Sequence, residues 1–438
     1  MPRETPRILA ATGLAALSLA CASYPERTSK AFGDFQAGHL ERSLKAYEQS
    51  ETTGSPFLAG AESGTVALAA GDWDAAIQNL GKAASEVEQV ERSALISPES
   101  LGETILSWTV NEGMKRYLGE GYERVMLHVG LAIAYLAKGD FESARVEVRQ
   151  SNALLESEEE LYEKEYEAGG LGHFLSAVTY EMDGRPDDAW IDYRRMREKG
   201  LGTDLACRAL ARLAATMHRE EDLDPDERQY LGTATTQDSA SVVVIAGVGI
   251  GPWKREILVP IPTSSGLLQW AVPAFEQRPQ PVDAVEISVA GGDRSVRTVV
   301  VEDVGSVAKE NLEDRIAWLA AKSAVRAVAK REMSQYLGEE AGAFGWILGT
   351  AVTIVSERAD LRAWQTLPHT WQAARVFLPP GTHEIRARAL GGEARDLGRF
   401  ELEPGETMFI LARTVETRLY AYPVGGRRIV SAAAPITP

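Results

Sequence analysis

The stretch SVVVIAGVGIGPWKREILVPIP, residues 241–262, decides between two fold classes for the C-terminal half. A β-branched run leads into glycines at 247, 249 and 251, as at the start of a dinucleotide-binding domain. That fingerprint needs G-x-G-x-x-G at the opening of a helix, so that the helix N–H groups meet a pyrophosphate. Here the third glycine comes one residue early, and Pro260 and Pro262 forbid a helix. The stretch therefore predicts a strand-to-strand connection without a bound nucleotide.

A phosphate-binding P-loop is excluded by the same stretch, because Lys254 follows no glycine and no Ser or Thr comes next. The polar and aromatic residues at its centre are instead candidates for an exposed contact with a partner. These possible partner contacts are Trp253, Lys254 and Arg255.

The rest of the C-terminal half, residues 231–438, predicts a mixed α+β domain with antiparallel strands. β-Branched runs bounded by Gly, Pro and Asp predict strands at 242–245, 257–261, 285–289 and 296–301. A helical stretch follows, in which Leu312, Ile316 and Leu319 share one face. Strands are again predicted within 374–390, 395–413 and 417–424, and residues 384–389 alternate between apolar and charged side chains. Strands, then a helix, then strands favour α+β over a doubly wound sheet.

Before this half, residues 21–230 carry a recurring helix–glycine–helix pattern. The pattern occurs at 35–48, 67–83, 134–150 and 180–196, with glycines at 38, 71, 139 and 184. The first two glycines are 33 residues apart and the next interval is 68. A period near 34 is typical of tetratricopeptide (TPR) repeats, so we expect a TPR-like α-helical solenoid. Trp73 and Phe141 are expected to fill the grooves between neighbouring helices. An irregular helical bundle is the alternative.

The first twenty residues predict a targeting signal. Arg3 and Arg7 precede an apolar segment that ends in Leu17-Ser18-Leu19-Ala20-Cys21. A cysteine directly after a small residue resembles the lipobox of bacterial lipoproteins, in which the cysteine is acylated after cleavage. The resemblance implies a signal peptide over 1–20, a lipid at Cys21, and a place in the cell envelope, favouring the outer membrane facing the periplasm. The alternative is an ordinary signal peptide.

Charge and cysteine content exclude several classes of function. The formal net charge is −17, so the overall field does not favour nucleic acid. The chain has two cysteines, and if Cys21 is acylated, Cys207 has no partner for a disulfide. A zinc cluster is excluded on ligand count, and we expect no cofactor, metal or nucleotide.

Three stretches together resemble a family of TPR-containing bacterial lipoproteins of unassigned molecular function. They are GEGYERVMLHVGLAIAYLAKGDFESARVEVRQSN (119–152), GIGPWKREILVPIP (249–262) and ADLRAWQTLPH (359–369). The resemblance implies an exported, lipid-anchored, helical-repeat protein and attaches no reaction to it. Genes of such families often lie near cell-wall synthesis factors.

No catalytic motif is recognisable in the sequence. His383-Glu384 begins an H-E pair, but Ala387 stands where the second zinc-binding histidine would be needed. Residues 341–356 are uncharged, which predicts a buried helix or, alternatively, a helix that contacts a partner or membrane. Two functions remain open. One is a lipid-anchored scaffold that binds envelope proteins in a concave groove lined by the first helix of each repeat. The other is an envelope enzyme, possibly acting on cell wall.

Overall fold

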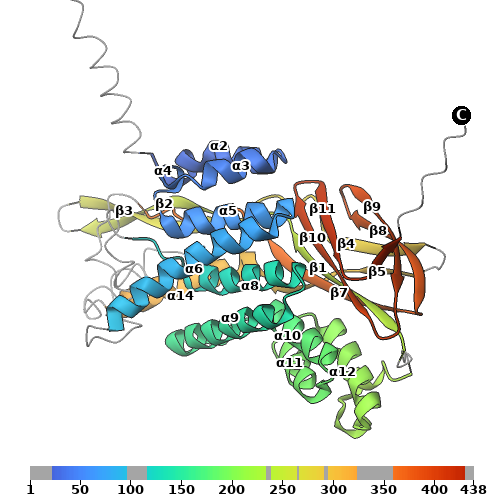
Figure 1. The fold of residues 1–438 in the computed structure, drawn as a ribbon. Coiled ribbons are helices and arrows are strands. Elements are labelled where there is room, and N and C mark those ends of the chain that lie inside the picture. The colour runs from blue at the N-terminus through green and yellow to red at the C-terminus, as the bar shows by residue number, and fades with distance from the viewer. Residues whose placement is uncertain are drawn as a thin grey trace, which may run out of the picture.

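A computed structural model describes residues 22–95, 116–232, 238–263, 266–290, 294–322 and 359–429 (Figure 1). Its helices are α2 (Tyr24–Gln36), α3 (Leu40–Tyr47), α4 (Ser50–Thr53), α5 (Pro56–Ala70), α6 (Trp73–Leu95), α8 (Gly121–Ala137), α9 (Phe141–Tyr162), α10 (Gly170–Met182), α11 (Pro186–Glu198), α12 (Thr203–Met217), the 3₁₀ turn η1 (Glu220–Asp222), α13 (Pro225–Arg228) and α14 (Val304–Lys322). The expected signal peptide, Cys21 and the uncharged segment 341–356 lie outside the described residues.

All the described strands come after the helical part in the chain. They are β1 (Ala240–Val248), β2 (Trp253–Thr263), β3 (Gly266–Glu276), β4 (Val285–Ala290), β5 (Arg294–Arg297), β6 (Val299–Asp303), β7 (Thr370–Leu378), β8 (Gly381–Ala389), β9 (Ala394–Leu402), β10 (Thr407–Val415), β11 (Arg418–Val424) and β12 (Arg427–Ile429). One further helix, α14, lies between β6 and β7. The predicted α+β class is therefore confirmed. The change from helices to strands falls between Arg228 and Ala240. Among the described residues, no helix is both long and apolar enough to cross a membrane.

The described helices form four consecutive hairpins, α2–α3, α5–α6, α8–α9 and α10–α11. In Figure 1 they lie in chain order from the top to the bottom of the view, beside the strands. Gly38, Gly71, Gly139 and Gly184 stand at the four turns, each with φ between 70° and 79°. Glycine adopts this left-handed conformation at no steric cost, which is why it ends the first helix of each hairpin. The predicted helix–glycine–helix units are confirmed.

The two helices of a hairpin differ in how they are buried. In α5, α8 and α10, the first helices, buried residues lie all around the axis, and Glu62 is the one charged residue of α5. In α9, a second helix, the buried residues Ala144, Val148, Ser151 and Leu155 form a single stripe. A single apolar stripe is typical of a helix with one solvent face. The first helices of these three hairpins are thus inner helices, and their second helices form the outer surface, whereas α2 is buried along a single stripe.

Ten strands build two stacked sheets. The first has the order β11-β10-β1-β7-β6, in which β1 and β10 run parallel and the other neighbours are antiparallel. The second, β12-β9-β8-β4-β5, is antiparallel throughout. Strands β2 and β3 form a separate hairpin. The second sheet contains the predicted alternation at 384–389, where Ile385 is buried and Arg386 exposed.

The first sheet is a middle layer, with helices on one face and the second sheet on the other. Val242 and Val244 of β1 share a core with Ile287 and Ile385 of the second sheet. The alternate residue Val243 belongs to the core of the inner helices. Both faces of β1 are therefore buried, which explains why its sequence is continuously apolar rather than alternating.

Two expectations about these layers are corrected. The strand predicted at 296–301 is two strands: β5 belongs to the second sheet and β6 to the first, and the chain crosses between them at Thr298. Trp73 and Phe141 pack against strands as well as against helices. The ring of Trp73 meets Tyr422 of β11 at 5.2 Å, and that of Phe141 meets Phe409 of β10 at 6.2 Å. Both follow a hairpin turn, so the turns of α5–α6 and α8–α9 pack on the sheet.

Candidate functional site

The segment 359–369, which leads into β7, lies against the inner helices α5 and α8. The backbone N–H of Trp364 donates to Oε1 of Glu123 at 2.7 Å. Those of Gln365 and Thr366 donate to the two carboxylate oxygens of Glu62, at 2.8 and 3.0 Å. Two buried glutamates on the first helices of two hairpins thus hold three successive N–H groups where the segment turns.

The side chain of Trp364 adds a second attachment. Its indole Nε1 donates to Oγ1 of Thr65 on α5 at 3.0 Å, and its ring stands edge-on to Phe57 at 6.4 Å. Only 3% of Trp364 is exposed. A buried tryptophan contributes a large apolar area while its N–H needs a partner, and α5 supplies both. The expected groove on the first helices is therefore filled, at α5 and α8, by the chain itself.

Burial controls the protonation of these carboxyl groups. It raises the pKa of Glu62 to about 7, although hydrogen bonds from Thr366, Tyr24 and Gln365 act in the opposite direction. Burial and the neighbouring Glu120 also raise the pKa of Glu123, while Lys254 lowers it. These carboxyl groups accept N–H and O–H donors in the core, which indicates that they hold the segment in place.

Lys254 belongs to the same buried network and is not an exposed contact residue. Its Nζ donates to Glu120 and, at 3.1 Å, to the carbonyl oxygen of Arg362. Arg315 of α14 also pairs with Glu120, at 3.2 Å. An unpaired charge here would be costly, so burial of Lys254 follows from the buried carboxylate. This corrects the expectation for Lys254.

The two neighbours of Lys254 remain predicted partner contacts. Trp253 is half-buried, and Arg255 is exposed and pairs with Glu276 of β3 at 3.0 Å. Alternation along β2 explains the difference, because successive side chains of a strand point to opposite faces.

The glycine loop between β1 and β2 surrounds a cation. The guanidinium of Arg413 donates to the carbonyl oxygens of Gly247, Gly249, Thr414 and Thr366, at 3.2 Å for Gly247, 2.7 Å for Thr414 and 3.0 Å for Thr366. Burial lowers the pKa of Arg413 to about 9. The loop therefore directs carbonyl groups at an arginine, whereas a phosphate site directs N–H groups at an anion.

The N–H groups of this loop have partners within the protein. Those of Gly249, Ile250 and Gly251 donate to Thr414 Oγ1, Gln280 Oε1 and the carbonyl oxygen of Leu367, at 2.9, 3.2 and 2.8 Å. The predicted strand-to-strand connection is confirmed, since the loop leads from β1 into β2. That it binds no nucleotide stays a prediction.

Inner helix α10 is attached to the first sheet at its N-terminus. The buried carboxylate of Glu302, on β6, accepts the N–H of Gly169 at 2.7 Å. Burial raises the pKa of Glu302 to about 7, against hydrogen bonds from the backbone of Gly169, Leu171 and Gly170. A carboxylate is favourable at this helix end because the N-terminal N–H groups carry partial positive charge. A Cβ on Gly170 would lie 1.9 Å from the carbonyl oxygen of Val301, so glycine permits the close approach.

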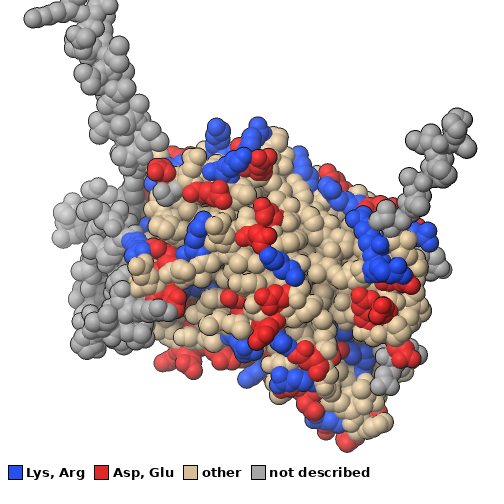
Figure 2. Space-filling model, in the orientation of Figure 1, with Lys and Arg blue, Asp and Glu red and all other residues tan. Residues whose placement is uncertain are grey.

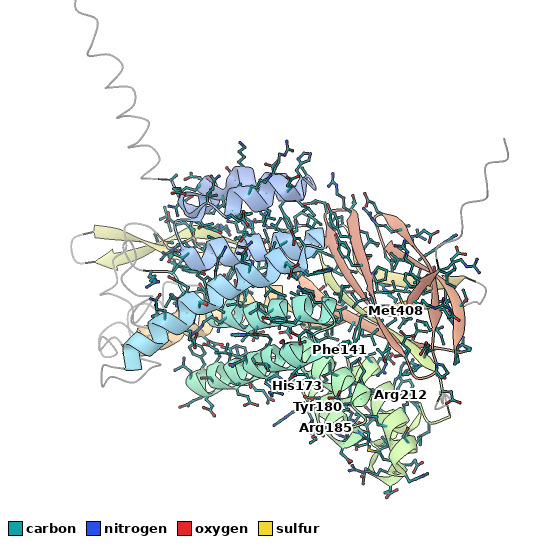
Figure 3. The ribbon with its side chains drawn as sticks, in the orientation of Figure 1. Phe141, His173, Tyr180, Arg185, Arg212 and Met408 are labelled. Carbon is teal, nitrogen blue, oxygen red and sulfur yellow. The ribbon has the colours of Figure 1, made fainter. Side chains whose placement is uncertain are left out.

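A wider opening lies elsewhere, between the helices α10–α12 and the end of β7. This cleft has a volume of about 670 Å³ and is lined by four arginines: Arg208, Arg212, Arg294 and Arg375. In Figure 3, Arg212 lies where the last helices meet the strands. By contrast, the space beside Trp364 holds about 30 Å³, roughly one water molecule. Within the described residues, no three His, Cys, Asp or Glu side chains are grouped to hold a metal ion.

Sequence reasoning missed both Glu62 and the cleft. Glu62 carried a signal, because it is the single charged residue in fifteen residues of apolar helix. The cleft carried none, since its arginines come from α12, β5 and β7. Comparison of the chain with protein-family models, curated proteins and solved structures gives no match.

Proposed function

We propose that the protein is a cell-envelope scaffold, anchored by a lipid at Cys21, that binds protein partners through TPR-like helical hairpins. The anchor rests on the lipobox in the sequence. Helix α2 begins at Tyr24, three residues after Cys21, so the anchor would hold the helical part close to the membrane.

One observation supports a binding role above the others. The inner helices already hold a segment of this chain, which turns at Gln365 and Thr366, through its backbone N–H groups, with Glu62 and Glu123 as acceptors. Recognition of a segment through its main chain is a recurring way in which proteins bind peptides. Because this inner surface is occupied, a partner would use the outer helices, in place of the groove that the sequence predicts.

The outer helices offer side chains to such a partner. Val146 of α9 is 41% exposed and Ile191 of α11 is 61% exposed. On the face shown in Figure 2, acidic and basic residues are interspersed over the helical part. A mixed surface with scattered apolar residues suits a protein partner better than a polyanion, which needs a basic patch.

A photocrosslinking scan in intact cells tests the proposal. Photoreactive residues are placed at Val146 and Ile191, and at the control positions Arg386 and Arg388 on the exposed face of β8. We expect protein crosslinks from the two helical positions. Crosslinks that arise only from β8 would overturn the proposal, because the helices would then serve as a spacer.

A further inference from the structure

The cleft between the last helices and β7 is positively charged within an acidic protein. Its four arginines face two carboxylates: Glu181 pairs with Arg212 and Arg375, at 2.7 and 2.8 Å, and Asp204 pairs with Arg208 at 2.8 Å. The described charges at the cleft therefore sum to +2, whereas the whole chain carries −17. Such a local reversal attracts an anionic group that the rest of the surface repels.

Two of the arginines are held in fixed positions. The guanidinium groups of Arg212 and Arg375 lie 5.0 and 4.7 Å from the ring centre of Phe377, and both hydrogen-bond to Glu181. Stacking on an aromatic ring and a shared carboxylate restrict both side chains before any ligand arrives. Their convergence on Glu181 shows that this geometry suits a carboxylate.

Arg375 also has donor capacity that its described contacts leave unused. Its side chain is 9% exposed and lines the cleft, and its Nε has no hydrogen-bond partner among the described residues. Because Nε is itself buried, a ligand oxygen would instead meet the terminal nitrogens, of which Nη2 makes only a long hydrogen bond to Ser241 Oγ, at 3.4 Å. Arg294, which is exposed and also lines the cleft, donates from Nη1 to the carbonyl oxygen of Phe377 at 3.0 Å.

Apart from Ser239 and Tyr193, the remaining lining is apolar. It comes from Leu205 and Ala209 of α12, from Val376 and Leu378 of β7, and from the Pro379–Pro380 turn. A volume of about 670 Å³ is in the range of sites that accept a small molecule or a few residues of a peptide.

We propose that this cleft binds a short acidic peptide segment, with carboxylates on Arg294, Arg375 and Arg212 and apolar side chains against the β7 turn. This inference rests on the scaffold proposal, because the acidic segment would come from a partner protein. Peptide binding measured on the purified protein is separate from crosslinking in cells, so either can fail without the other.

Fluorescence anisotropy on the full chain in non-ionic detergent tests the proposal. The probe is a labelled peptide in which Glu and Leu alternate, and its neutral counterpart has Gln in place of Glu. We expect the acidic peptide alone to bind, and added salt to weaken it. Arg294→Gln, which removes an exposed side chain, should weaken binding about tenfold, as expected for one charge-assisted hydrogen bond.

The matched control is Arg185→Gln, on the neighbouring helix turn outside the cleft (Figure 3). It should leave binding unchanged. Equal binding of the neutral peptide, equal weakening by both variants, or tighter binding of inorganic phosphate than of the peptide would each overturn the assignment. Arg212→Lys provides a second cleft variant, which keeps the charge but loses the planar fork and should also weaken binding.

Discussion

Glu62 accepts a hydrogen bond from the backbone N–H of Thr366, 304 residues later in the chain. The contact joins an inner helix to the segment that precedes β7. A second contact of the same kind joins the stretches 119–152 and 359–369, because Glu123 from the first accepts the N–H of Trp364 from the second. The helical part and the strands thus share one core, which contains Leu80 and Phe174 as well as Phe409 and Leu411.

Replacement of Glu62 by alanine should destabilise the whole protein. Glu62→Ala leaves the N–H groups of Gln365 and Thr366 and the hydroxyl of Tyr24 without their acceptor. Each unsatisfied buried donor costs about 1–3 kcal/mol, so we expect a loss of several kcal/mol in chemical denaturation. The control Glu41→Ala removes an exposed partner of Lys45 and should leave the free energy of unfolding nearly unchanged. Similar losses in both variants would contradict the role given to Glu62.

Stability should fall as the pH rises from about 5 to 8, in part because of Glu302. Its pKa rises from 4.5 unfolded to about 7 folded, so the folded state binds the proton more tightly. That contribution is present in full below the unfolded pKa and is lost as the pH passes through 7, an effect on the order of 3 kcal/mol. Glu302→Gln removes the titration and should flatten the curve of melting temperature against pH. An unchanged slope would show that the group does not titrate in this window.

Helix α10 should tolerate no side chain at its first residue. In Gly170→Ala the new Cβ would clash with the carbonyl oxygen of Val301, and we expect a loss of about 2 kcal/mol or more as helix and strand separate. Gly81→Ala is the matched control, because Gly81 lies within α6 with nothing within 4 Å of the added Cβ. That change should stabilise the protein by up to about 1 kcal/mol through helix propensity. Thermal unfolding of the two variants should therefore shift in opposite directions.

The glycine loop should be sensitive to substitution and insensitive to nucleotides. Gly249 has φ 69°, and a Cβ there would lie 1.9 Å from Oε1 of Gln280, so Gly249→Ala should lower stability. Calorimetric titration of the wild type with ATP or NAD should give no heat of binding. Micromolar binding that Gly249→Ala abolishes would show that the loop is a nucleotide site after all.

The lipid anchor has its own test. Cys21→Ala should move the protein from the membrane fraction to the soluble fraction, because the acyl chains supply the membrane affinity. Metabolic labelling with a palmitate analogue should mark the wild type and not the variant. If the wild type is not labelled, the predicted lipid at Cys21 is wrong.

Local patterns in the sequence predict the elements of this fold better than their partners. The glycines at 38, 71, 139 and 184 identify the helical hairpins because a left-handed turn residue is a local requirement. The burial of Lys254 could not be predicted from its neighbours, since the cause is Glu120, which lies 134 residues away. The same holds for the inner helices, because the segment that covers them, residues 359–369, lies far away in the sequence, after β6. A pattern along the chain reveals which face is apolar, and not what covers it.

Hydrogen–deuterium exchange at Trp364, Gln365 and Thr366 tests most directly whether the chain itself fills the inner helical surface. These three residues lie outside any helix or strand, and in an ordinary loop their amides would exchange rapidly. The contacts with Glu62 and Glu123 predict protection as strong as that of Val242–Ile245 in the middle strand β1. Exchange as fast as in the exposed turn at 403–406 would contradict the account and would leave the inner helices open to a partner.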